Sequence, residues 1–231
     1  VAQLATALSR AGFTAKETSQ ALRGVVMGAE ATSVSFEEMG SVISDVMRSF
    51  GIDTSKTPKV VDILVKSANS SNQTVLDLGE AMKYAAPVAR TLGINVNDLA
   101  ATMALMANNG IRGSDAGTAL RSGLSRLQLA ASGSNDELMG LTKGSELLAK
   151  VMKVMGADVL NAQGQLKPMD QVILSLRDNM NKLPVGQRAE IAKALFGDEA
   201  GSKFLALLNS SEAQIVSMFD KIRNSGGATE E

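Results

Sequence analysis

The sequence contains no cysteine, no histidine and no tryptophan, and aromatic residues make up only 3% of it. Without cysteine the chain forms neither disulfides nor thiolate zinc sites, which fits a protein made in a reducing cytoplasm. Without histidine it lacks the commonest general base near neutral pH and the commonest metal ligand. We therefore predict a protein that is not an enzyme, with no catalytic residue, no metal and no cofactor.

An excess of one charge and a long apolar run are also missing. The 23 Lys and Arg residues nearly cancel the 24 Asp and Glu residues, and no run of like charge occurs. Proteins that bind duplex nucleic acid need a concentrated basic surface, so we expect no sequence-specific nucleic-acid partner. No apolar run approaches the roughly 20 residues that cross a bilayer.

The chain does have ample apolar material for a core. Hydrophobic residues make up 45% of the 231 positions, and they are mostly Ala, Leu, Val and Met. Small and flexible side chains suit thin layers of closely packed helices better than a bulky globular centre. We therefore expect a mainly α fold, made of short helical hairpins in an elongated, repeat-like stack.

Four helix starts share one pattern, in which a capping residue is followed three positions later by an acid. The capping side chain accepts a hydrogen bond from an unpaired backbone N–H, and the acid faces the positive end of the helix dipole. The pairs are Thr14 with Glu17, Ser35 with Glu38, Thr74 with Asp77, and Asn95 with Asp98. Four starts before residue 100 predict short helices.

Helix ends share a second pattern, a glycine followed by an apolar residue. Glycine adopts the left-handed conformation that ends a helix, and the apolar residue packs back on the last turn. The pairs are Gly12-Phe13, Gly51-Ile52, Gly93-Ile94 and Gly110-Ile111. A spacing of 39 residues separates Ser35 from Thr74, and also Gly12 from Gly51. We interpret residues 1–132 as two to three weakly repeated helical hairpins.

The residue pattern changes at about residue 133, and residues 133–231 form the second predicted region. A small β-hairpin is expected near residues 157–168, with a turn at Gly164, and Pro168 is expected to open the next helix. Further helices are expected at about 168–182, 185–196, 199–208 and 211–223, with one joint at Gly197. The first residue is not Met and the last residues are polar, so we expect a fragment of a much longer chain.

The segment NNGIRGSDAGTALR, residues 108–121, allows two interpretations. A phosphate-binding loop would need Gly-Lys-Ser/Thr after a strand, and this segment contains no Lys and follows a Met-rich helical pattern. We therefore favour a joint between two helices. In that joint, which includes Gly113, Gly110 ends one helix and Ser114 or Asp115 caps the next. Ala116, Gly117 and Ala119 let that next helix approach a neighbouring helix closely.

The order of three motifs resembles the core region of phage tail tape-measure proteins. These motifs are NGIRGSDAGTALR, the D-x-x-G-x-L-x-P segment that ends at Pro168, and LFG-x-x-A at residues 195–200. The resemblance covers nearly the whole chain. It implies a structural segment of a long, mainly helical protein that lies along the tail tube, sets tail length and leaves the virion ahead of the genome.

The resemblance also implies the partners and the location. These are other copies of the chain, tail-tube and tail-tip or baseplate proteins, assembly chaperones, and transient contact with the host membrane. The protein would be made in the host cytoplasm and reside in the phage tail. The residues themselves leave an alternative open, a helical-repeat adaptor that binds a protein partner in a groove.

Overall fold

The structure, a computed structural model, describes residues 13–131 and 165–229 and the single positions 5, 6, 8, 9, 151, 159 and 161. No strand occurs among these residues, and the predicted mainly α fold class is confirmed. The elements are α2 (Ala15–Thr32), α3 (Phe36–Phe50), η1 (Thr54–Lys56), α4 (Thr57–Asn69), α5 (Val75–Thr91), α6 (Val96–Asn108), α7 (Gly113–Ala131), α9 (Met169–Asn181), α10 (Val185–Phe196), α11 (Asp198–Leu208) and α12 (Glu212–Arg223).

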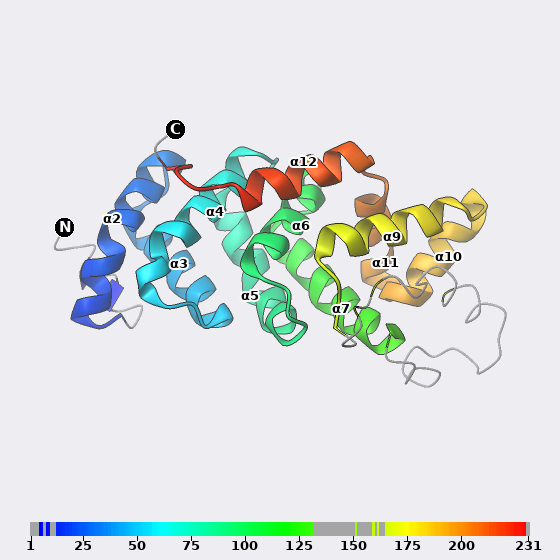
Figure 1. The fold of residues 1–231 in the computed structure, drawn as a ribbon, viewed down its shortest axis with the longest axis horizontal. Coiled ribbons are helices and arrows are strands. Elements are labelled where there is room, and N and C mark those ends of the chain that lie inside the picture. Colours follow the sequence, from blue (N-terminus) through cyan, green and yellow to red (C-terminus); the bar gives the residue numbers. More distant parts are fainter. Residues whose placement is uncertain are drawn as a thin grey trace.

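Helices α2 to α7 form three hairpins that stack side by side in an elongated body (Figure 1). Helices α2, α4 and α6 make one layer, and helices α3, α5 and α7 make the other. Each helix packs against the next member of its own layer, most extensively where α5 meets α7. The repeat-like stack of hairpins is therefore present, because a spacing of one hairpin along the chain places equivalent helices next to each other.

The predicted helix starts are capped as expected in α2, α3 and α5. Thr14, Ser35 and Thr74 each accept the N–H of the acid three positions later, and that acid accepts the N–H of the capping residue in return. Hydrogen bonds from the capping residue lower the pKa of Glu17 and of Glu38 below the usual range. Asn95 caps α6 in one direction only, through a 2.9 Å bond from the Asp98 N–H.

The helix ends also follow the predicted pattern. At three joints the residue after glycine donates its N–H to the carbonyl five positions back, which is the bond that closes a Schellman turn. The bonds run from Ile52 to Met47 at 2.8 Å, from Ile94 to Ala89 at 2.9 Å and from Ile111 to Met106 at 2.9 Å. Residues 108–121 thus join α6 to α7, and a helix rather than a strand precedes them.

The start of α7 differs from the expectation. The sequence predicts Ser114 or Asp115 as the N-cap, but the helix already begins at Gly113, so both residues lie in its first turn. Gly113 has a φ of 59° and makes the turn into the helix without help from a capping side chain at those two positions. Asp115 instead forms an exposed ion pair with Lys203 of α11 at 3.0 Å.

The four helices predicted for the C-terminal part lie within one residue of their expected bounds. Helices α10 and α11 pack on α7 and extend the stack at one end. Helix α12 folds back over the hairpins, where it packs against α6, α9 and α4 (Figure 1). Helix α6 therefore has neighbours on many sides, and its residues from Asp98 to Ala107 are all buried.

The predicted β-hairpin near 157–168 falls largely outside the described residues, as does its turn glycine, Gly164. The described positions nearby make two backbone hydrogen bonds, from the Asn161 N–H to the Gln165 carbonyl at 2.8 Å and from the Lys167 N–H to the Val159 carbonyl at 2.9 Å. Pro168 directly precedes α9 and occupies its N-cap position. Among the helices of the described part, none is long and apolar enough to cross a membrane.

Candidate functional site: a basic pocket where two helix joints meet

The structure separates the glycines that the sequence analysis singled out into several places. Gly51, Gly93, Gly110, Gly113 and Gly197 have φ between 59° and 94° and lie at helix ends or starts. Gly117 lies inside α7, where a Cβ would overlap the carbonyl oxygen of Ala81 and approach its Cα to 2.8 Å. Gly51 and Gly93, at two different helix joints, line a common pocket.

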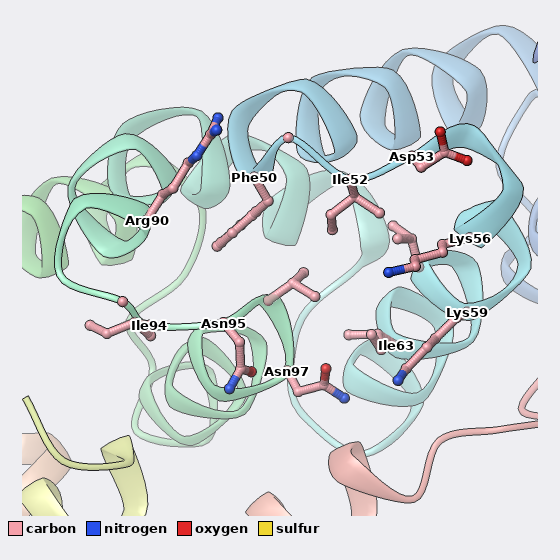
Figure 2. A pocket seen from close by; sticks show the side chains of 14 residues that line it. Phe50, Ile52, Asp53, Lys56, Lys59, Ile63, Arg90, Ile94, Asn95 and Asn97 are labelled. Carbon is pink, nitrogen blue, oxygen red and sulfur yellow. The ribbon is translucent and has the colours of Figure 1, made fainter.

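This pocket has a volume of about 500 Å³ and lies between the α3–α4 joint, the first turns of α4, the α5–α6 joint and the start of α6 (Figure 2). The two joints come together because α3 and α5 are neighbours in one layer, while α4 and α6 are neighbours in the other. The pocket is thus a product of the hairpin stack. No local pattern in the sequence predicts this pocket, although the sequence does identify both of its glycines as helix joints.

One wall of the pocket is apolar. Its side chains come from the end of α3, the joint that follows it, α4, the second joint and the start of α6: Phe50, Ile52, Val60, Ile63, Ile94 and Val96. The side chains of Phe50 and Ile52 point into the space between the joints (Figure 2). Both are partly buried and pack against the core, so they stand at the boundary between core and solvent.

The rim of the pocket carries three cations, Lys56, Lys59 and Arg90. Lys56 and Lys59 are exposed and make no ion pair within the described residues. Arg90 donates to the Ser49 carbonyl at 3.4 Å, and its guanidinium lies against Gly51, 2.8 Å from where a Cβ would stand. With three cations and one carboxylate, Asp53, in its lining, the pocket carries an excess of positive charge.

The one carboxylate that lines the pocket is already engaged. Asp53 accepts the N–H of Ser55 at 2.9 Å and also its hydroxyl, and these bonds hold the pKa of Asp53 below the usual range. Its side chain points away from the space between the joints (Figure 2). The positive charge of Lys56 lowers the pKa of Asp53 further, so Asp53 offsets the charge of Lys56 in part without forming an ion pair with it.

The start of α6 adds further donors to the pocket. The first N–H groups of a helix have no acceptor within it. Asn95 satisfies the N–H of Asp98, while no described residue supplies an acceptor for the N–H groups of Val96 and Asn97. The Asn97 side chain is used elsewhere, donating to the Ile222 carbonyl at 3.2 Å. The positive end of the α6 dipole thus faces the same space as the cations.

A second polar cluster lies close by, and its function is structural. Asp98, only 4% exposed, accepts the Met169 N–H at 3.3 Å and the Arg223 guanidinium at 3.0 Å. Arg223 also holds Asp170 through two bonds of 2.8 Å, which lower the pKa of Asp170 and raise that of Arg223. The cluster ties α6, α9 and α12 together.

This cluster corrects the simple view of Asp98 as a capping acid. Asp98 is the third residue of α6, as the pattern predicts, but its carboxylate does not return a bond to Asn95. It turns instead toward an arginine 125 positions later in the chain. No local spacing could have signalled that partner.

The pocket lining offers groups of two kinds, apolar side chains and cationic or N–H donors. Among the described residues no group of three or more acidic side chains is placed to hold a metal ion. The pocket combines an apolar wall with ammonium, guanidinium and N–H donors, and its side chains include no pair of nucleophile and base. Such a lining can donate hydrogen bonds to an anion and cover an apolar side chain.

Comparison with known proteins gives a consistent result. Residues 1–197 match the family described as phage-related minor tail protein. The chain is 30% identical over 224 residues to the tape measure protein of Pneumococcus phage Dp-1, covering 97% of this chain and 18% of that protein. It is 27% identical over 177 residues to the probable tape measure protein of Escherichia phage P2, covering 76% of this chain and 20% of that protein. The chain spans about a fifth of the length of these curated relatives, and no solved structure matches it.

Proposed function

The chain belongs to the phage-related minor tail protein family, and we propose that it is a structural segment of a tail tape-measure protein. The observation that carries this proposal is its similarity to the tape measure protein of Pneumococcus phage Dp-1 along 97% of its length. In this role the parent protein takes part in tail assembly, tail length determination and genome ejection. The segment resides in the phage tail after synthesis in the host cytoplasm, and it acts without catalysis.

The stacked hairpins support a particular place for this segment within such a protein. A length gauge works through extended helices, since each helical residue adds 1.5 Å along the axis. Here the helices are short and fold back on one another in two layers. We therefore assign this segment to a compact module of the tape measure, which contacts its own copies, tail-tube and tail-tip or baseplate proteins and assembly chaperones. Transient contact with the host membrane during ejection belongs to the same proposal.

The test of the gauge function is a change of length in the parent phage. Helical sequence flanking this segment is deleted or duplicated in frame, and tails of the assembled virions are measured by electron microscopy. Tails should shorten or lengthen in proportion to the residues removed or added. Synonymous recoding of the same region is the control. Tails of unchanged length in the variants would remove the gauge function.

A second candidate function, a helical-repeat adaptor, is favoured by the pocket between the Gly51 and Gly93 joints. Stacked helical hairpins present concave surfaces that bind peptides. Flanking sequence discriminates the two functions. Hundreds of residues of helical pattern on either side support the tape measure, whereas a short parent protein that ends near this segment supports the adaptor.

A further inference from the structure

We infer that the pocket between the Gly51 and Gly93 joints binds an acidic peptide segment that carries an apolar side chain. This inference stands on the pocket alone and is independent of the tape-measure role. The pocket encloses about 500 Å³, which is ample for one large side chain and part of the backbone on either side of it.

The pocket mouth carries more positive than negative charge. Lys56 ends η1 and Lys59 lies in the first turn of α4; neither forms an ion pair within 4.0 Å among the described residues, although Asp53 offsets part of the charge of Lys56. Arg90 of α5 completes the rim, and among the described residues its hydrogen-bond partner is the Ser49 carbonyl. Carboxylates placed here would gain charge-assisted hydrogen bonds without breaking an existing ion pair.

An apolar wall lies beside these cations in the same pocket. Phe50, Ile52 and Ile63 face the space that the lysines border (Figure 2). An apolar side chain of the ligand would cover this wall and remove it from water, at roughly 25 cal/mol per Å² of apolar surface buried. The charged groups would then orient the ligand, while the wall would hold it.

The combination favours a peptide over the other anions. Nucleic acid needs a basic track long enough for several phosphates, and here three cations surround one hollow in a chain of net charge −1. Inorganic phosphate would leave the apolar wall uncovered. A segment in which carboxylates flank a Phe or Leu matches both parts of the pocket at once.

The test uses the 231-residue chain and three fluorescein-labelled peptides of sequence EEFEE, QQFQQ and EESEE, measured by fluorescence anisotropy at low salt. We expect EEFEE to bind at least about tenfold more tightly than either of the others. QQFQQ lacks the carboxylates that would pair with the cations, and EESEE lacks the apolar side chain that would cover the wall. Binding should weaken as salt is raised, since the charges lie at the surface.

The variant Lys56→Glu/Lys59→Glu should bind EEFEE at least about tenfold more weakly. The control Lys83→Glu/Lys221→Glu carries the same change in charge on exposed lysines outside the pocket and should bind as the unmodified chain does. Circular dichroism checks that both variants keep their helices. Equal binding by the three peptides, or by the two variants, would overturn the inference. So would tighter binding of polyphosphate or of phosphatidylglycerol vesicles than of EEFEE.

Discussion

Glycines serve two purposes in this chain, and their surroundings distinguish them. Gly51 and Gly93 have φ of 64° and 76°, so they provide a backbone conformation that other residues adopt only with strain. Gly117 has an ordinary helical backbone, but α5 leaves no room for a side chain there. Small residues at that contact let the two helices approach each other closely.

The Gly117→Ala variant tests this close approach. Alanine is the better helix former, yet its methyl group would overlap the carbonyl oxygen of Ala81, so we expect a loss of about 1–3 kcal/mol in the free energy of unfolding. Urea denaturation followed by circular dichroism measures it.

Gly186 provides the matched control for that measurement. It lies in α10, and no atom stands within 4 Å of the place that an added methyl group would take. Gly186→Ala should therefore leave stability unchanged or raise it by up to about 1 kcal/mol. Similar effects of the two substitutions would contradict the assigned role of Gly117.

At the scale of elements, the Asp98 cluster holds three helices that are far apart in the chain. Asp98 belongs to α6, Asp170 to α9 and Arg223 to α12, and the arginine bridges the two carboxylates. The guanidinium also lies 5.2 Å above the Phe219 ring. Because Asp98 is buried, its charge is stabilised mainly by this partner and by the Met169 N–H.

Replacing Asp98 by Asn should therefore be costly. The substitution removes the buried charge from beside Arg223 and turns one acceptor oxygen into a donor, and we expect a loss of about 2 kcal/mol in the free energy of unfolding. This value lies below that of a fully buried pair because the Arg223 side chain is 35% exposed and keeps Asp170.

Asp115→Asn is the comparison for this experiment. Asp115 also pairs with a distant cation, Lys203, but its side chain is 75% exposed, so its loss should change stability by no more than about 0.5 kcal/mol. Thermal unfolding of both variants decides the matter. Equal shifts in Tm would show that the Asp98 cluster contributes no more than a surface pair.

For the whole molecule, the decisive feature is that α12 returns over the hairpin stack. Ile215, Phe219 and Ile222 of α12 are at most 1% exposed. Beyond this helix, Asp62 of α4 accepts the N–H groups of Gly227 and Thr229 at 3.0 and 3.2 Å. The end of the described chain is thereby anchored on an early hairpin, and helices of the two predicted regions share one hydrophobic core. The division at residues 132 and 133 stays a prediction.

In a stack whose hairpins contact mainly their neighbours, a destabilising substitution should lower the stability of nearby helices more than that of distant ones. Phe219→Ala removes a ring that is 1% exposed, at a cost of about 3–5 kcal/mol, and should speed amide hydrogen exchange in α6, α9 and α12 more than in α2. Hydrogen exchange with mass spectrometry resolves these helices.

Val216→Ala, at a position 42% exposed on the same helix, should leave the exchange pattern nearly unchanged. A uniform acceleration that includes α2 in the Phe219 variant would contradict local coupling. It would instead indicate that the chain unfolds as one cooperative unit.

The sequence alone determined where helices begin and end, because these signals act over three to five residues. A cap such as Ser35 and a stop such as Gly51 satisfy backbone groups of their own helix, so their effect can be read without knowing the fold. The 39-residue spacing extended this to the stack of hairpins, since equal units pack in equal ways. The start of α7 was misjudged because Gly113 makes the turn without a capping side chain at Ser114 or Asp115.

Only the tertiary structure decided which distant residues meet. The partner of Asp98 is an arginine 125 positions away, and the pocket unites two joints that lie on different hairpins. Such contacts depend on the path of α12 and on the order of the layers, which are set by the burial of whole helix faces. The hydrophobic effect has no preferred direction and stabilises contact with any apolar surface. The sequence of one helix therefore does not specify which other helix it packs against; the complete stack decides this.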